Sequence, residues 1–117
     1  MFYAAMDIKC RRDDYLKIVN KNINLENIDK SIELVKRFPD YEFRTTVLPF
    51  FKENDFEEIG KWIAGYKKIK LYSLQQFNPK RTFDPEYGKM IPKTRQELEA
   101  FAEIMKNYSE NVRVLGC

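Results

Sequence analysis

The sequence predicts an α/β protein in which strands and helices alternate along the chain. Four segments are rich in β-branched and aromatic residues, which is typical of strands. Three longer segments repeat apolar residues at helical spacing. Strands that alternate with helices pair in parallel through right-handed crossovers. About four parallel strands and three main helices would form either a small open sheet or part of a (β/α) barrel.

The predicted strands are short segments with clear ends. Residues 2–9 are largely apolar and end in charge, whereas residues 41–48 are aromatic and β-branched and are closed by Pro49. Residues 69–74 form the third predicted strand, and residues 112–115 form the last. A helical turn at residues 13–19 follows the first strand.

The three main helices are predicted from caps and apolar stripes. Asn24 can accept hydrogen bonds from the first turn of a helix that Pro39 ends. Asn54 and Glu57 have capping-box spacing for a helix that reaches about Tyr66. Another capping box, Thr94 with Glu97, opens the last helix. The inward-facing residues are predicted to be Leu25, Ile28, Ile32 and Val35, then Phe56, Ile59 and Ile63, and finally Leu98, Phe101, Ala102 and Met105.

Composition bounds the function classes. The 117 residues are 44% hydrophobic and 15% aromatic, enough for one compact domain over residues 1–117. The net charge of +3 requires neither nucleic acid nor a membrane as a partner. No apolar run reaches the roughly 20 residues of a membrane span, and no signal peptide is recognisable, so a cytoplasmic location is expected. The absence of histidine excludes Ser-His and Cys-His catalysis.

Ligands bind at the carboxyl ends of the strands in open α/β sheets and (β/α) barrels. At the end of the first strand, Asp7 and Lys9 are two residues apart and point to one face. They could hold ribose hydroxyls and an amino-acid carboxylate. An ordinary strand-end ion pair is the alternative.

The second strand places a cation among apolar neighbours. Arg44 must face either solvent or a polar barrel lumen, and Thr46 shares its face. A guanidinium there would suit a carboxylate held in a bidentate manner, and a solvated surface strand is the alternative.

The third strand leads into a long loop predicted over residues 75–93, which contain three prolines and a glycine. Its first amides, Gln75, Gln76 and Asn78, could read the edge of a purine, or could simply cap the loop. Cys10 is interpreted as a small buried residue rather than a nucleophile.

Four segments occur in an order and spacing that resemble the radical S-adenosylmethionine (SAM) activating proteins of glycyl-radical enzymes. They are Met-Asp-Ile-Lys at 6–9, Ser-Ile-Glu-Leu at 31–34, Tyr-Glu-Phe-Arg-Thr-Thr-Val at 41–47 and Leu-Gln-Gln-Phe at 74–77. The chain is most similar to the activating proteins of anaerobic ribonucleoside-triphosphate reductase and, more distantly, to those of pyruvate formate-lyase.

The resemblance implies a partial (β/α) barrel in which a [4Fe–4S] cluster cleaves SAM. The resulting 5′-deoxyadenosyl radical takes hydrogen from a glycine of the partner enzyme. It also implies that Asp7 and Lys9 contact the SAM ribose or methionine carboxylate, that Arg44 faces the same lumen, and that Gln76 and Asn78 lie near the adenine.

The chain departs from this family in one respect. The family's cluster needs three closely spaced cysteines, but only Cys10 and Cys117 are present. The chain therefore resembles the C-terminal part of the catalytic domain, and we expect it to be inert alone. Self-association through the exposed edge at residues 2–9 is also expected. A non-catalytic docking module, for a glycyl-radical partner or for a complementary half-barrel, is the alternative.

Overall fold

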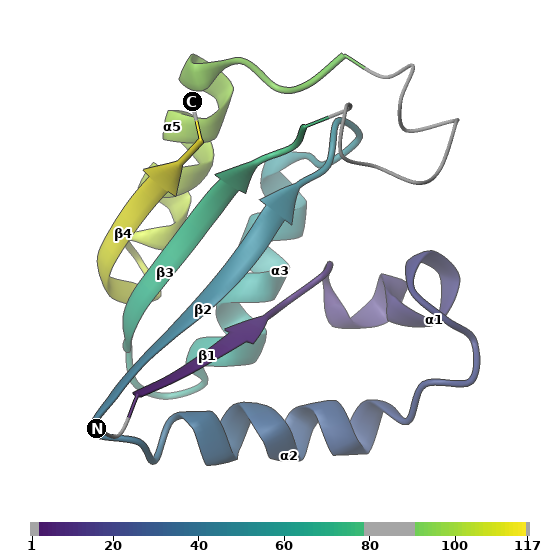
Figure 1. The fold of residues 1–117 in the computed structure, drawn as a ribbon, viewed down its shortest axis with the longest axis vertical. Coiled ribbons are helices and arrows are strands. Elements are labelled where there is room, and N and C mark those ends of the chain that lie inside the picture. Colours follow the sequence, from purple (N-terminus) through teal and green to yellow (C-terminus); the bar gives the residue numbers. More distant parts are fainter. Residues whose placement is uncertain (1–2, 79–90, 117) are drawn as a thin grey trace.

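The computed structural model describes residues 3–78 and 91–116, which form one four-stranded sheet with helices (Figure 1). In chain order the elements are β1 (Tyr3–Asp7), the 3₁₀ turn η1 (Arg12–Asp14), α1 (Tyr15–Ile18), α2 (Leu25–Val35), β2 (Asp40–Val47), α3 (Glu53–Ala64), β3 (Ile69–Gln76), α5 (Arg95–Met105) and β4 (Ser109–Leu115). Within the described residues the strands follow the order β1-β2-β3-β4, and every neighbouring pair is parallel.

The long helices lie on one face of the sheet. Right-handed crossovers that always step to the next strand in the same direction place their helices on the same side. The helix contacts agree with this rule, because Trp62 of α3 donates a hydrogen bond to Asp29 of α2, and Phe56 of α3 stacks on Phe101 of α5 with 4.5 Å between ring centroids. The other face, which we call the open face, is not covered by any of these helices (Figure 1).

The hydrophobic core fills the space between the sheet and the helices. Phe43 and Val47 of β2 and Tyr72 and Leu74 of β3 point toward the helices and are fully buried. The helices meet them with buried side chains at the spacing predicted from the sequence: Ile32, Phe56, Ile59, Ile63, Leu98, Phe101, Ala102 and Met105. Alternate residues of the same strands must then point to the open face.

The predicted fold class and all four strands are confirmed. The second strand begins and ends one residue earlier than predicted, at Asp40–Val47, and the last strand starts three residues earlier, at Ser109–Leu115. Asn24 caps α2 as expected, since its side chain accepts from the N–H groups of Glu26 and Asn27. The last capping box is also confirmed, with reciprocal bonds between Thr94 and Glu97.

Two boundaries at α3 were predicted wrongly. The cap is Lys52 rather than Asn54, because the Asp55 carboxylate accepts from the Lys52 N–H at 2.8 Å, and the helix therefore begins two residues earlier than predicted. The helix ends at Ala64 rather than near Tyr66, since Gly65 has a φ of 65°, a left-handed conformation that only glycine adopts readily.

The predicted loop after the third strand begins later than expected. Gln75 and Gln76 continue β3, since Gln75 and Gln76 pair in register with Thr46 and Val47 of β2. Most of the remaining loop prediction falls on residues 79–90, which lie outside the described residues. No helix in the described part of the chain is long and apolar enough to cross a bilayer.

Candidate functional site on the open face

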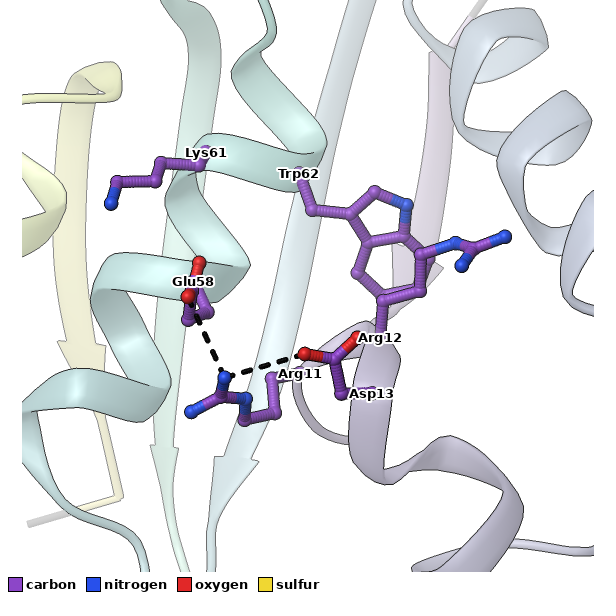
Figure 2. Close-up of a pocket in the computed structure, with 6 residues that line it drawn as sticks. All are labelled: Arg11, Arg12, Asp13, Glu58, Lys61 and Trp62. Carbon is purple, nitrogen blue, oxygen red and sulfur yellow. Dashed lines mark hydrogen bonds and ion pairs between the residues drawn. The ribbon is translucent and has the colours of Figure 1, made fainter.

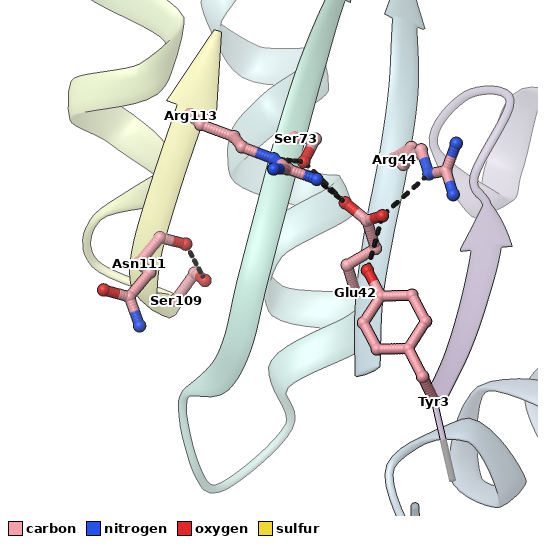
Figure 3. Close-up of polar contacts among 7 residues, drawn as sticks. All are labelled: Tyr3, Glu42, Arg44, Ser73, Ser109, Asn111 and Arg113. Carbon is pink, nitrogen blue, oxygen red and sulfur yellow. Dashed lines mark hydrogen bonds and ion pairs between the residues drawn. The ribbon is translucent and has the colours of Figure 1, made fainter. Parts of the chain in front are cut away.

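A carboxylate occupies the middle of the open face. Glu42 of β2 is only 2% exposed, although no helix covers it. Its Oε1 accepts from the Tyr3 hydroxyl of β1 at 2.6 Å, and its Oε2 accepts from the Ser73 hydroxyl of β3 at 2.7 Å (Figure 3). Arg113 of β4 donates to the same Oε2 at 2.9 Å and to Ser73 Oγ at 2.8 Å. One side chain from each strand therefore takes part in this network.

The network keeps Glu42 ionised. Burial alone would raise the pKa of its carboxyl group, but hydrogen bonds from Tyr3, Ser73 and Arg113, together with the charge of Arg44, outweigh burial and lower the pKa to about 2. The same contact raises the pKa of the Tyr3 hydroxyl, because Glu42 accepts its proton in a hydrogen bond. Glu42 thus carries a full negative charge at neutral pH.

Arg44 lies on the opposite side of Glu42 from Arg113 (Figure 3). Its Nε is 3.1 Å from Glu42 Oε1, yet the two groups are not aligned for a hydrogen bond, and this buried nitrogen has no hydrogen-bond partner among the described residues. The Arg44 side chain is 40% exposed. The prediction that Arg44 faces solvent or a polar lumen is met by its place on the open face.

Asp7 and Lys9 lie at the carboxyl end of β1, next to Arg44. Asp7 is in register with Arg44, so the two side chains leave neighbouring strands on the same face. Lys9 Nζ is 3.7 Å from Asp7 Oδ2, and both side chains are more than half exposed. An exposed pair of this kind contributes little to stability and leaves both groups accessible to a ligand.

Gln76 and Asn78 lie two strands away from Asp7. Gln76 is in register with the buried Val47, so it points toward the helix side of the sheet. Its amide bonds the backbone at both ends, donating to Lys93 O at 2.7 Å and accepting from Phe77 N at 2.9 Å. Asn78 is exposed just beyond β3. On the open face, the last polar residue of β3 is instead Gln75, which is in register with Thr46.

A pocket of about 280 Å³ opens at the carboxyl ends of β1 and β2. It is lined by Lys9, Ile18, Val19, Thr46 and Leu48. Apolar side chains from α1 and from the end of β2 thus meet one cation and one hydroxyl. The pocket lies just beyond Asp7 and Arg44, since Lys9 and Thr46 follow them by two residues. This corner of the open face is therefore a candidate site for a ligand with both apolar and charged parts.

A second pocket of about 270 Å³ lies among Arg11, Arg12, Asp13, Glu58, Lys61 and Trp62 (Figure 2). Most of its charges are paired with one another or with a neighbour: Arg11 lies 3.4 Å from Asp13 and 3.5 Å from Glu58. Arg12 holds Asp29 through two hydrogen bonds of 3.1 and 3.0 Å. These contacts tie η1 to α2 and α3, which indicates a structural role for this pocket.

The described residues do not fit an iron–sulfur cluster. They contain no group of three cysteine, histidine or acidic side chains that could hold a metal. Cys10 is 1% exposed, as predicted, and burial together with the charges of Asp14 and Asp55 raises the pKa of its thiol to about 12. A thiol of this kind stays protonated and is a poor ligand. Cys117 lies outside the described residues.

Sequence reasoning missed Glu42, Ser73, Arg113 and Tyr3. The signal was present in the alternation of β2, where Glu42 shares a face with Arg44 and Thr46. Glu42 lies between Tyr41 and Phe43 in a predicted strand, and an acidic residue in that position indicates a buried polar contact. The pairing of Glu42 with Arg113 depends on the strand order, which the sequence does not specify.

The fold and the site together define a class of protein: a partial (β/α) barrel whose parallel sheet carries charged side chains on its open face. The chain is 37% identical, over 116 residues, to a protein of Methanocaldococcus jannaschii named as a glycyl-radical enzyme activating enzyme, covering 94% of this chain and 47% of that protein. It is 30% identical over 103 residues to the ribosomal protein uS12 methylthiotransferase of Clostridium botulinum, covering 81% of this chain and 23% of that protein. No family model matches the chain.

The fold resembles a solved domain of the pyruvate-formate lyase-activating enzyme of Bacteroides vulgatus. The TM-score is 0.63 at 16% identity, and the match covers 97% of this chain and 67% of that one. These comparisons confirm the resemblance to radical SAM activating enzymes of glycyl-radical enzymes. The chain spans about half the length, or less, of the curated relatives it matches.

Proposed function

We propose that this chain is the C-terminal portion of a radical SAM (β/α) barrel domain and that it binds SAM at the corner of the open face next to β1. One observation carries this proposal. Asp7 and Arg44 stand in register on neighbouring strands, and an apolar pocket bordered by Lys9 and Thr46 adjoins them. The position at the carboxyl ends of parallel strands is the usual ligand position in such sheets.

The chemistry of SAM fits these side chains. SAM combines an amino-acid head, a ribose and a flat aromatic purine. Arg44 offers a planar donor to the carboxylate, while Asp7 accepts from ribose hydroxyls or from the amino group. The apolar wall of Ile18 and Leu48 would contact the flat purine face, and Asn78 would lie near its polar edge. Gln76 points to the helix side, and its bonds to Lys93 O and Phe77 N would hold the backbone next to Asn78 in place.

In the whole protein, residues other than those described would have to hold the [4Fe–4S] cluster, which would supply reducing chemistry next to bound SAM, and the protein would act on a glycyl-radical enzyme. The described residues contain no ligand set for this cluster, so we expect no SAM cleavage by this chain alone. The protein partner would be an anaerobic ribonucleotide reductase or a pyruvate formate-lyase type of enzyme, in the cytoplasm. The similarity to the M. jannaschii protein supports this class of partner.

SAM binding to the chain can be measured by isothermal titration calorimetry under anaerobic conditions. We expect weak binding that falls about tenfold in Arg44→Gln, because the carboxylate loses its planar partner. The matched control is Arg95→Gln, which removes a similarly charged group from α5, where Arg95 pairs with the exposed Glu99. Equal affinities for the two variants would contradict the proposed site.

A docking module that lacks a SAM site is the second candidate, and the open edge of β1 favours it. Among the described residues β1 pairs only with β2. A complementary strand could add to this edge, either from another copy of the chain or from a separate half-barrel. Binding of SAM by the chain would distinguish the first proposal from this one.

A further inference from the structure

The Glu42 network spans the open face from β1 to β4, and Arg44 links it to the proposed SAM corner. Arg113 belongs to β4, three strands from Asp7, which is a separation of roughly 14 Å at the usual strand spacing. Arg113 is in register with Ser73, and Ser73 with Arg44. Arg44 and Arg113 therefore lie at the same level on the two strands that flank β3, whose backbones are roughly 10 Å apart.

Stability alone does not account for this arrangement. Taking a carboxylate out of water is costly, and apolar residues of the same size often stabilise a protein as well or better than a buried ion pair. Here a 3% exposed carboxylate is kept on a face that no helix covers. Its effect is to fix the positions of two guanidinium groups, one on each side (Figure 3).

The network contains more positive charge than negative charge, and its two arginine side chains are partly accessible to a ligand. One carboxylate faces two guanidinium groups, and the neighbouring Asp7 is paired with Lys9. Arg113 uses Nε for Ser73 and Nη2 for Glu42, and its side chain is still 49% exposed. Arg44 is 40% exposed, and its buried Nε has no hydrogen-bond partner among the described residues.

We propose that Arg44 and Arg113 form a two-guanidinium clamp for a carboxylate group of a ligand on the open face, with Glu42 as the positioning residue between them. A planar carboxylate matches the planar fork of a guanidinium better than a spherical anion does. The inference rests on the proposed function and extends it to a second ligand, because the clamp shares Arg44 with the proposed SAM corner but reaches from β2 across β3 to β4. The carboxylate is either a free α-carboxylate or an acidic side chain of a peptide.

The test uses the arginine Nε–Hε signals in nuclear magnetic resonance spectra of the whole 117-residue chain, titrated with sodium acetate against sodium chloride at the same ionic strength. We expect saturable shifts at Arg44 and Arg113 with acetate only, and an affinity about tenfold lower in Arg113→Lys, which keeps the charge and loses the fork. Arg95→Gln is the control and should bind acetate like the wild type. N-acetylglycine carries a free α-carboxylate, and N-acetylaspartyl-methylamide carries a side-chain carboxylate. The compound that binds more tightly identifies the source of the carboxylate.

Equal shifts with acetate and chloride, or a wild-type affinity in Arg113→Lys, would overturn the clamp. Arg44→Lys tests the same clamp from β2 if the Arg113 variant does not fold, as judged by circular dichroism. The titration contains no SAM. Failure of SAM to bind would therefore refute the proposed function without affecting the clamp. Failure of acetate to bind would refute the clamp without affecting the proposed function.

Discussion

Glu42 shows how a charged side chain is kept inside a sheet that has one uncovered face. Its two carboxylate oxygens receive bonds from Tyr3, Ser73 and Arg113, so almost all of its accepting capacity is used. Such a group is sensitive to the loss of its charge, because its partners would remain in place without the anion for which they are arranged.

Replacing Glu42 by Gln should lower the free energy of unfolding by about 1–3 kcal/mol at pH 7, less than for a fully buried pair because both arginines are partly exposed. The Glu42 pKa falls from 4.5 to about 2 in the folded state. Its stabilising contribution is therefore complete above pH 4.5 and lost as the pH falls toward 2.

Urea unfolding of the wild type and Glu42→Gln between pH 7 and pH 2 measures this contribution. The stability difference between the two should shrink as the pH falls through that window. Glu110→Gln on β4 is the control, since Glu110 is exposed. A difference that stays constant with pH would show that Glu42 is not the titrating group.

The sequence predicted the positions of some individual residues correctly but not the contacts that join residues of different strands. Alternation in β2 was enough to place Arg44 on a polar face, and helical spacing was enough to find the buried stripes of α3 and α5. The partners of Glu42 could not be predicted, because they come from three other strands whose order is a property of the whole chain. The amide of Gln76 was predicted either to read a purine edge or to cap the loop, and in the structure it bonds the backbone of Lys93 and Phe77.

At the scale of the element, α3 depends on one position without a side chain. Gly60 is buried in the middle of the helix, and a Cβ atom added there would overlap the ring of Tyr108. Tyr108 precedes β4 and donates a hydrogen bond to Glu57 of α3. The helix thus gives up the propensity of an alanine, about 1 kcal/mol, to let this ring lie against its backbone.

Gly60→Ala should therefore destabilise the protein by about 1–3 kcal/mol, although alanine is the better helix former. Thermal unfolding followed by circular dichroism measures the change. In a Tyr108→Ala background the same substitution should be neutral or stabilising, because the overlap is gone. A stabilised Gly60→Ala in the wild-type background would contradict the close approach of Tyr108.

At the scale of the whole molecule, the sheet ends in two strands that each pair on one side only within the described residues. Ile8 N donates to Arg44 O of β2. By alternation, the N–H groups of Ala4 and Met6 face β2, and that of Ala5 faces the outer edge. Unpaired edges of this kind favour pairing with another strand.

We expect the chain to self-associate through β1, as measured by sedimentation velocity over a range of protein concentrations. Ala5→Pro removes an outward N–H group and should shift the chain toward the monomer. Ala5→Val, which keeps the N–H group, should associate like the wild type. A wild-type chain that remains monomeric at the highest concentration would refute pairing through this edge.

The strand order also determines the sequence in which the molecule can assemble. Among the described strands, each one after β1 pairs with the strand that precedes it in the chain, so each new pairing closes only the connection between two consecutive strands. The sheet can therefore grow from β1 as the chain is synthesised. Arg113 arrives with β4, the fourth of the described strands, so the Glu42 carboxylate gains this second guanidinium only after β2 and β3 have been made.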